Sequence, residues 1–395
     1  MDMPGPLTPE EAKLLLALCR AGKLYEIERW ITSGKSLQTP SGFKKSPLSI
    51  AVEMGFHSLV ELLARNESSQ EIKNKALSDA ISTKRLDLVE LLIAHGAQVR
   101  SVPFAGVLCK WDPAMMRFFL ENDADVITGH PFAVAFGEKI RTSLRPFVEY
   151  KKAHPEIASE LQEQADRALR YFSREGDLKW VSLMLWAGAN PRTRGPLLDD
   201  RIEDDPECYT TALREACYKG SFEVLIKLKP DASGDDMSDL LHCAALPASD
   251  ELIRYLLKMG AKPNDKANGG SSALDRCLWN LGFKDFDAII NKRPASRYAL
   301  HGTFDCIQTL VERGALWRPD SRAELNSLRQ ILFKCEPEVT VEVVKLLARF
   351  KACPEETLDH FLDTPRMRSH LSKLGMKLYA GHVDKDVKPR SHRGT

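Results

Sequence analysis

His242 and Cys243 are adjacent in the sequence, and both side chains could act in nucleophilic catalysis or bind a metal ion. A catalytic cysteine needs a base within reach and an exposed, electropositive surrounding. These two residues instead lie inside an apolar run, Leu240–Ala245, which is typical of a packed helix. The spacings H-x-x-x-H and C-x-x-C, which would bring metal ligands together, do not occur in the sequence. We therefore predict structural roles for both residues and no metal site.

Sequence motifs for phosphate-binding loops are missing as well. The sequence contains neither G-x-x-x-x-G-K-S/T nor G-x-G-x-x-G. Its most glycine-rich stretch, Asn268–Ser272, is short and is typical of a turn. We predict a protein that uses no cofactor and is not an enzyme.

The composition fits a packed protein with a mixed surface, because 43% of the 395 residues are hydrophobic and 28% are charged. The formal net charge is +1, which is too small to attract nucleic acid over the whole surface. Nucleic acid is therefore unlikely as a partner and could bind only through local basic patches. Nine cysteines without short spacings argue against disulfides and fit a reducing cytoplasm. We expect no transmembrane helix, because no long apolar run occurs. The N-terminus also lacks the pattern of a secretory signal.

Internal repetition is the strongest pattern in the sequence. Residues 46–66 and 76–99 each contain a short apolar helix, a tight turn and a second apolar helix with the sequence Val-Glu-Leu-Leu. The same frame fits the segments 14–34, 104–126, 168–191, 211–230, 240–264, 298–317 and 327–352. Helices this short are unstable alone, but stacked pairs bury a continuous core. Glycines at the turns supply a backbone conformation with positive φ.

The spacing of the repeated glycines locates an irregular part of the array. Gly96 and Gly188 are 92 residues apart, which is about three repeats and predicts a degenerate repeat near 131–153. We predict one all-α solenoid of about ten helix-turn-helix repeats over residues 1–372, with two insertions. A short polar and basic tail follows at 373–395.

The repeats resemble those of the ankyrin family. The family's T-P-L-H-x-A segment occurs as Ser46–Ala51 and Leu240–Ala245, and its Gly-Ala-Asp/Asn ending occurs at Gly188–Asn190. The resemblance extends over residues 10–372. It implies that His242 forms a hydrogen bond between neighbouring turns and stabilises the stack. It also implies that a partner binds the concave face, which is made by the finger loops and the inner helices.

By this resemblance, three finger loops carry candidate partner-binding residues. They are Phe43, Lys44 and Lys45 on the first loop, Arg192 and Arg194 on the second, and Lys266 and Asn268 on the third. Phe43 is the most informative of them, because an aromatic side chain at a loop tip has no core to fill. The alternative is a solvated loop surface without a partner.

An acidic insertion near 192–209 begins in the second finger. The segment 197–207 is rich in carboxylates, and the candidates are Asp199, Asp200, Asp204 and Asp205. They could hold a basic partner or imitate nucleic-acid charge in a basic cleft. The alternatives are a solubilising loop and local compensation of Arg192 and Arg194.

A second insertion, near 279–297, mixes aromatic and basic residues. The candidates for partner contact are Trp279, Phe283, Phe286 and Arg293. Aromatic residues and arginine dominate protein interfaces, so a contact patch is one interpretation, and an extra helix on the edge of the solenoid is the other. Two further tryptophans follow the repeat frame, which places Trp180 in the core and leaves Trp186 partly exposed.

Together these features predict a non-catalytic protein–protein interaction module that binds one specific protein partner through the concave face, finger loops and insertions. Two other functions stay open. One is an inhibitor or immunity-type regulator that blocks an enzyme's basic cleft with segment 197–207. The other is a nucleic-acid-associated subunit of a complex, which would use the local basic patches. We expect a cytoplasmic protein without a membrane contact, and the sequence does not indicate its oligomeric state.

Overall fold

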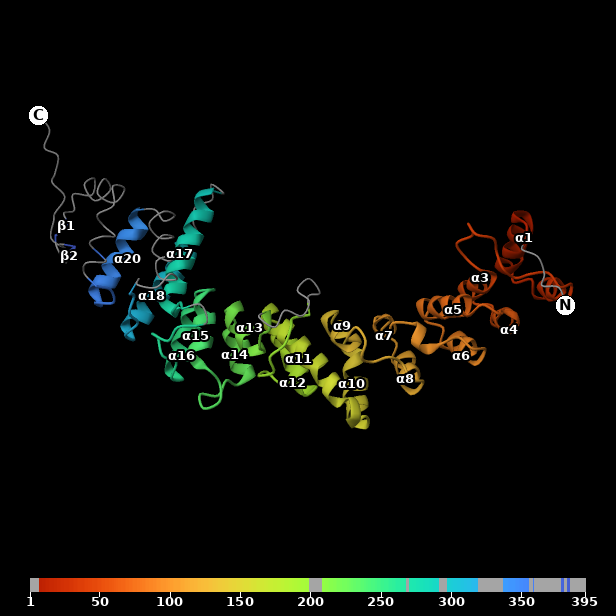
Figure 1. Cartoon of the computed structure of the whole chain (residues 1–395), viewed down its shortest axis with the longest axis horizontal. Coiled ribbons are helices and arrows are strands. Elements are labelled where there is room, and N and C mark those ends of the chain that lie inside the picture. The colour runs from red at the N-terminus through yellow and green to blue at the C-terminus, as the bar shows by residue number, and fades with distance from the viewer. Residues whose placement is uncertain are drawn as a thin grey trace, which may run out of the picture. The chain divides into compact units, whose positions relative to one another are not determined.

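The computed structural model describes residues 7–198, 208–267, 270–290, 297–318 and 337–354, together with Leu358, residues 378–379 and residues 382–383. Regular structure in these ranges is almost entirely helical (Figure 1). The helices form consecutive pairs from α1/α2 to α17/α18, and α20 follows. This arrangement confirms the predicted all-α helical-repeat fold, with nine complete pairs in the described part of the chain.

The chain divides into two compact units, and the boundary runs through helix α11. Unit 1 comprises residues 1–168 and 186–189, and unit 2 comprises residues 169–185 and 190–395.

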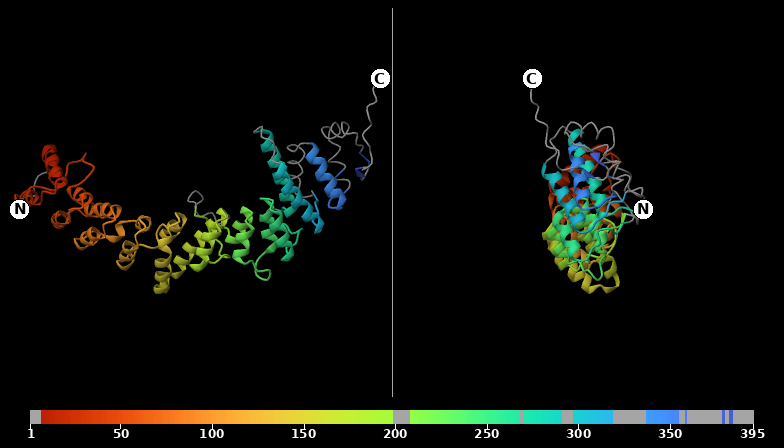
Figure 2. Two further views of the ribbon diagram at one scale, coloured as in Figure 1. Left: turned by 180° about the vertical axis from the view of Figure 1, so that it is seen from behind. Right: turned by 90° about the vertical axis from the view of Figure 1, so that its left-hand side faces the viewer.

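The helices of unit 1 stack in the order of the sequence, as the red to yellow ribbons of Figures 1 and 2 show. They are α1 (Pro9–Arg20), α2 (Leu24–Thr32), α3 (Pro47–Met54), α4 (His57–Asn66), α5 (Gln70–Ser82), α6 (Leu86–Ala94), α7 (Phe104–Leu108), α8 (Pro113–Glu121), α9 (Pro131–Gly137) and α10 (Leu144–Ala153). Three short 3-10 helices accompany them: η1 (Val99–Ser101), η2 (Arg141–Ser143) and η3 (Pro155–Ile157). First helices pack on first helices, α1 on α3 and α3 on α5, while α2 packs on α4 and α4 on α6. The pairs α7/α8 and α9/α10 contact each other in the same way.

Helix α11 (Ala158–Glu175) and the following elements continue the series of pairs. They are α12 (Leu178–Trp186), α13 (Ala212–Lys219), α14 (Phe222–Leu228), α15 (Met237–Ala245), α16 (Asp250–Lys258), α17 (Ala273–Ile290), α18 (Arg297–Glu312) and α20 (Pro337–Arg349). In unit 2, α13, α15 and α17 are successive first helices that contact one another in that order, and α16 packs on α18.

A reciprocal cap formed by neighbouring residues starts the first helix. The Thr8 hydroxyl accepts a hydrogen bond from the Glu11 N–H at 3.3 Å, and the Glu11 carboxylate accepts one from the Thr8 N–H at 3.2 Å. Pro9 occupies the first helical position, where its missing N–H costs nothing. This reciprocal cap satisfies donors that the helix leaves free, so local sequence alone defines the start of α1.

Left-handed glycines end the first helices of several pairs, as predicted. Gly55 has a φ of 74° and caps α3, and Gly220 has a φ of 78° and caps α13. A Cβ atom on Gly220 would lie 3.1 Å from the Cβ of Pro247 in the next pair. Here glycine is needed both for the backbone conformation and for the close approach of two neighbouring turns.

Residues 131–153, where we predict a degenerate repeat, contain the helix pair α9/α10. Its core is aromatic: the Phe132 ring lies 5.1 Å from Phe147 and 5.6 Å from Phe104 of the preceding pair, between ring centroids. Phe136 lies 5.2 Å from Phe147. These rings supply the packed seam that aliphatic residues provide in the other pairs.

A buried glutamine connects this pair to the next helix. Gln164 of α11 is fully buried, and its amide donates to the Val126 carbonyl at 2.8 Å and accepts from the Phe132 N–H at 2.9 Å. Phe132 is the second residue of α9, so its N–H has no partner within the helix. One side chain thereby satisfies two buried backbone groups from different parts of unit 1.

The two tryptophan predictions are confirmed. Trp180 is 5% exposed and stacks on Phe172 of α11 with ring centroids 5.1 Å apart. Trp186 is 61% exposed.

The prediction of a complete helix-turn-helix at 298–317 is wrong. That segment contains the single helix α18, whose partner in the pair is the unbroken helix α17. Much of the predicted insertion near 279–297 therefore lengthens these two helices. The fully buried apolar residues of α17, Leu274, Cys277, Leu278 and Leu281, lie in its first half, and the helix continues beyond them. Its partner α18 is long as well, and the two helices pack on each other.

Two short strands lie in the predicted C-terminal tail, where no strand was predicted. Leu378–Tyr379 (β1) pairs antiparallel with His382–Val383 (β2), with Leu378 opposite Val383. Within the described ranges, no helix combines the length and the apolar character that a membrane span requires.

Candidate functional site

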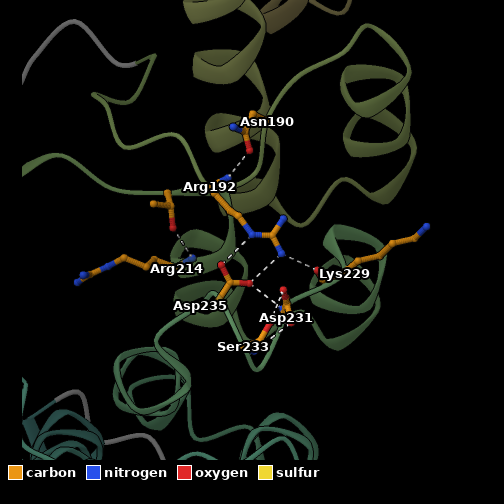
Figure 3. Close-up of polar contacts among 8 residues, drawn as sticks. Asn190, Arg192, Arg214, Lys229, Asp231, Ser233 and Asp235 are labelled. Atoms are coloured by element: carbon orange, nitrogen blue, oxygen red, sulfur yellow. Dashed lines mark hydrogen bonds and ion pairs between the residues drawn. The ribbon is translucent and has the colours of Figure 1, made fainter.

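The finger loop after α12 is held by an arginine that bonds to the next finger of unit 2. Both ends of the Arg192 guanidinium donate to Asp235, each at 2.9 Å, and one nitrogen also donates to the Lys229 carbonyl at 3.0 Å. Figure 3 shows this arrangement, in which the Asp231 N–H also donates to Asp235, at 2.7 Å. Arg192, Asp235, Asp231 and the Lys229 carbonyl thus form one hydrogen-bonded cluster. The predicted cation Arg192 is thus paired within the protein, although 42% of its side chain remains exposed.

The acidic insertion leaves this finger from a fixed base. Gly195 and Thr210 form an isolated antiparallel bridge, and Arg194 donates to the Tyr209 carbonyl at 3.1 Å. Arg170 of α11 is 1% exposed and donates to the Pro196 carbonyl at 2.9 Å. Both ends of the insertion are therefore tied to unit 2.

Glycine is required at this base for lack of space. A Cβ atom on Gly195 would lie 2.6 Å from a guanidinium nitrogen of Arg170, so any other residue would force this buried guanidinium to move. The predicted carboxylates of the insertion lie outside the described residues: Asp199, Asp200, Asp204 and Asp205.

The first helices of unit 2 carry a row of partly exposed arginine, aromatic and acidic side chains. The row consists of Arg214 and Tyr218 on α13, Asp239 on α15, and Arg276 and Trp279 on α17. Arg214 forms an ion pair with Asp239 at 3.1 Å, which connects two neighbouring pairs. Its guanidinium lies 6.0 Å from the centre of the Tyr218 ring.

Arg276 differs from Arg214 in its partners. Its guanidinium lies 6.0 Å from the centre of the Trp279 ring, and its Nε, like that of Arg214, is buried without a hydrogen-bond acceptor. Among the described side chains, no carboxylate forms an ion pair with it. Its charge is therefore not balanced by an ion pair with a described carboxylate, which distinguishes it from Arg214.

Burial determines the pKa shifts of the acidic side chains in and beside this row. Burial raises the pKa of Asp239 above its ordinary value, although the nearby Arg214 acts in the opposite direction. Burial likewise raises the pKa of Glu215 on α13.

His242 has the structural role that the resemblance implies. Its Nε2 lies 2.9 Å from the Ser271 hydroxyl in the next finger loop, and only 7% of the residue is exposed. Burial, with smaller contributions from Arg276 and Arg214, lowers the pKa of His242 to about 4. A neutral histidine at neutral pH can share this hydrogen bond without a buried charge.

The buried thiols of Cys243 and Cys217 are poor nucleophiles. Burial raises the pKa of Cys243 to about 12 and the pKa of Cys217 well above its ordinary value. Such thiols stay protonated at neutral pH, and the thiolate is the reactive form. In the part of the chain that the structure describes, no three His, Cys, Asp or Glu side chains gather as metal ligands.

The first predicted finger belongs to unit 1. Phe43 is partly buried, and its N–H donates to the Pro40 carbonyl at 3.3 Å. Lys45 forms an ion pair with Glu53 of α3, and Lys44 is exposed. This loop therefore offers Lys44 and part of the Phe43 ring to solvent.

The remaining predicted residues are only partly described. Lys266 is exposed in the loop that follows α16, and Trp279 is part of the row. Phe283 and Phe286 lie within α17, and their side chains are outside the described parts of the structure. Asn268 and Arg293 are also outside them.

Sequence analysis missed Arg170, Arg214 and Arg276. Arg214 could have been found, because it occupies the histidine slot of the repeat frame in Thr211–Ala216. Arg170 and Arg276 carry no such signal, because their importance depends on loops packed against them.

The comparisons agree with the geometry of a helical-repeat protein. Residues 14–102 match the family model of ankyrin repeats in three copies, so this segment consists of ankyrin repeats and confirms the predicted family. No curated protein sequence matches the chain.

Two solved structures are similar to the chain at low identity. The human ASB11 ankyrin repeat domain is 16% identical, with 76% of this chain and 98% of that chain covered and a TM-score of 0.25. The ankyrin repeat domain of Bcl-3, a member of the IkappaB protein family, is 15% identical, with 66% and 91% covered and a TM-score of 0.31.

Proposed function

We propose that the protein is a non-catalytic binding module that holds a specific protein partner on the row of unit 2 and the loops beside it. Ankyrin repeats are generally protein-interaction modules, and residues 14–102 consist of them. The observation that carries the proposal for unit 2 is Arg276, a half-buried cation 6.0 Å from the Trp279 ring that forms no ion pair with a described carboxylate.

The composition of the row supports a protein as the partner. Arginine, tyrosine and tryptophan are the residues that most often dominate binding energy at protein interfaces. A carboxylate of the partner would pair with the exposed part of the Arg276 side chain, and an apolar group would pack on Trp279. Asp239 in the middle of the row would repel a phosphate backbone.

The basic residues support nucleic acid less well. Arg192 is paired with Asp235, and Lys45 with Glu53. These pairs reduce the uncompensated positive charge that phosphate binding requires.

The test is affinity capture from the native lysate, with the captured proteins identified by mass spectrometry. Wild type is compared with Arg276→Ala and Trp279→Ala, and Ile226→Ala on α14 serves as an exposed control in the same unit. We expect one dominant protein, whose affinity falls about tenfold or more in the two row variants and is unchanged in the control. Equal capture by all variants, or recovery of nucleic acid alone, would contradict the proposal. Melting curves show whether each variant remains folded.

A second candidate function is regulation of an enzyme by the acidic segment 197–207. The supporting observation is the fixed base, where Arg170 and Arg194 tie both ends of the insertion to unit 2. A basic cleft would accept such a segment, and the attraction would weaken with salt.

This candidate is tested with two variants of the insertion. One deletes residues 199–207, and the other keeps the length but replaces each carboxylate by its amide. Loss of capture in both variants, together with weaker wild-type binding at high salt, supports the regulator. Capture that survives neutralisation of the carboxylates would rule it out and leave the row as the binding surface.

A further inference from the structure

The first helix of the array, α1, has apolar residues on two opposite sides. The residues of its buried side have the spacing i, i+3, i+4 and i+7 of a helix that packs on a core, and they are Ala12, Leu15, Leu16 and Cys19. The same spacing recurs two positions further on, in residues that we call the α1 stripe: Leu14, Ala17, Leu18 and Ala21. Two positions correspond to about 200° around a helix, so the α1 stripe lies almost opposite the buried side.

The α1 stripe faces solvent, although most of its equivalents in the next pair are buried. Leu14 is 54% exposed, Ala17 and Ala21 are exposed, and Leu18 is half-buried. The positions of α3 that match the first three residues of the stripe are all buried, and they are Pro47, Ile50 and Ala51. Helix α3 packs on α1, whereas no described helix precedes α1. The stripe is therefore the surface on which a preceding first helix would pack.

The second helix of the pair closes the same end of the stack with polar groups. Glu26 of α2 is exposed, and the Lys23 ammonium lies 3.9 Å from its carboxylate. The matching residue of α4 is Leu59, which is buried. A terminal pair needs a polar outer face for solubility, and α2 meets this need while α1 does not. The open apolar surface therefore belongs to α1 alone and does not extend over a whole pair.

The two edges of the α1 stripe differ in charge. Lys13 and Arg20 lie seven positions apart on one edge, both are exposed, and neither forms an ion pair with a described carboxylate. Glu11 lies on the other edge, but its carboxylate is engaged by Lys35 at 3.1 Å and by the Thr8 N–H at 3.2 Å. The charge that a ligand meets along the edges of the stripe is therefore positive.

We propose that the α1 stripe binds a single amphipathic helix of a protein partner, which carries its own apolar stripe and acidic residues along one edge. Ala17 and Ala21 have small side chains, so the axis of that helix can come as close as the lower end of the usual range of about 8–10 Å. The acidic edge of the bound helix meets the basic edge of α1. Its carboxylates should therefore be spaced as Lys13 and Arg20 are, seven positions apart. This surface lies in unit 1 and is independent of the row of unit 2.

Two other occupants fit the stripe less well. In an antiparallel two-fold pair each edge meets itself, so a second copy of the chain would bring Lys13 beside the Arg20 of the other copy. A parallel pair would align the two helix dipoles unfavourably. A flat anionic membrane surface would meet the exposed Glu10 and Glu26 together with the basic edge. A single helix can end before Glu10 and place its carboxylates on the basic edge alone.

The test selects peptides of about two heptads from a phage library, with a fixed stripe of leucine and alanine and all other positions randomised. The whole protein is the bait, and Leu14→Glu is the counter-selection. We expect the peptides that discriminate between the two proteins to carry acidic residues along one edge. Their affinity, measured by fluorescence anisotropy, should fall about tenfold or more in Leu14→Glu. The matched control is Ile127→Glu, at another exposed apolar residue of unit 1, and it should bind as the wild type does.

An exchange of charge tests the basic edge. The double variant Lys13→Glu with Arg20→Glu should bind the selected peptides several-fold more weakly, because like charges then meet. The same peptides with lysine in place of the acidic residues should bind the double variant more tightly than they bind the wild type.

Stability and self-association distinguish this occupant from the others. Leu14 faces solvent, so Leu14→Glu should melt within a few degrees of the wild type, and a larger loss would show that the stripe belongs to the fold. Self-association of the wild type in sedimentation that Leu14→Glu abolishes would assign the surface to a second copy. Phosphatidylserine vesicles that bind the wild type but not Leu14→Glu would assign it to a membrane. Each of these results, like the absence of a discriminating peptide, peptides without an acidic edge or a charge exchange without rescue, would overturn the proposal.

Discussion

Gln164→Leu should destabilise unit 1 far more than an ordinary substitution on helix α11. The side chain is fully buried, and its amide bonds both the Val126 carbonyl and the Phe132 N–H. Leucine has nearly the same size but can satisfy neither group. A buried backbone group that loses its partner costs about 1–3 kcal/mol, so two such groups cost about 2–6 kcal/mol.

Burial of the leucine offsets part of this cost. Its extra apolar surface contributes about 1 kcal/mol, which leaves an expected loss of about 1–5 kcal/mol in the free energy of unfolding. That is a large fraction of the stability of an ordinary domain. In a repeat array the loss falls mainly on neighbouring pairs, so α9 and α10 should open first.

Urea denaturation followed by circular dichroism measures the total loss, and hydrogen exchange with mass spectrometry locates it. The Phe132 amide should be protected in the wild type and should exchange quickly in Gln164→Leu. Glu160→Leu, on the exposed side of the same helix, is the matched control and should change stability by less than about 0.5 kcal/mol. A Leu variant with wild-type stability and a protected Phe132 amide would refute the reasoning.

Three further predictions concern unit 2. The pKa of His242 is about 4 in the folded protein against an ordinary 6.5, so the unfolded chain binds the proton first as the pH falls through that window. Stability should therefore fall by about 2 kcal/mol between neutral pH and about pH 5, and His242→Gln should remove this part of the pH dependence of urea denaturation. Arg192→Ala should cost about 1 kcal/mol, because the ion pair with Asp235 is half exposed, and Arg192→Lys should restore only part of it, since lysine lacks the bidentate geometry. Gly220→Ala should lower the free energy of unfolding by about 1–2 kcal/mol through the left-handed backbone, and by more if Pro247 cannot move, as melting curves would show.

Structural features that depend only on residues close in the sequence were predictable from the sequence. The cap of Thr8 on α1 and the left-handed Gly55 arise from chemistry within a few residues. The degenerate repeat near 131–153 was predictable too, because its apolar pattern persists although Lys139 replaces the turn glycine. Helix pairs with an apolar stripe must stack, so the family resemblance and the helical-repeat fold followed from the same pattern.

The length of α17 could not be predicted with the same means. An apolar run that continues past the usual turn is compatible with one long helix or with two short ones. The packing of α17 against α18 decides the question, because each of these two long helices has the other as its partner in the pair.

The candidate site shows where the limit of the sequence lies. Which residues are charged, aromatic or glycine was readable directly, and so was the presence of an acidic insertion. The partner of each charged residue was not readable from the sequence, because Arg192 bonds to an aspartate 43 positions away and Arg170 bonds to a loop 26 positions away. Such pairs depend on the register in which one helix pair packs on the next. Only the tertiary structure could therefore show that Arg192 is paired inside the protein, that Arg276 has a nitrogen without an acceptor, and that Leu14 faces solvent.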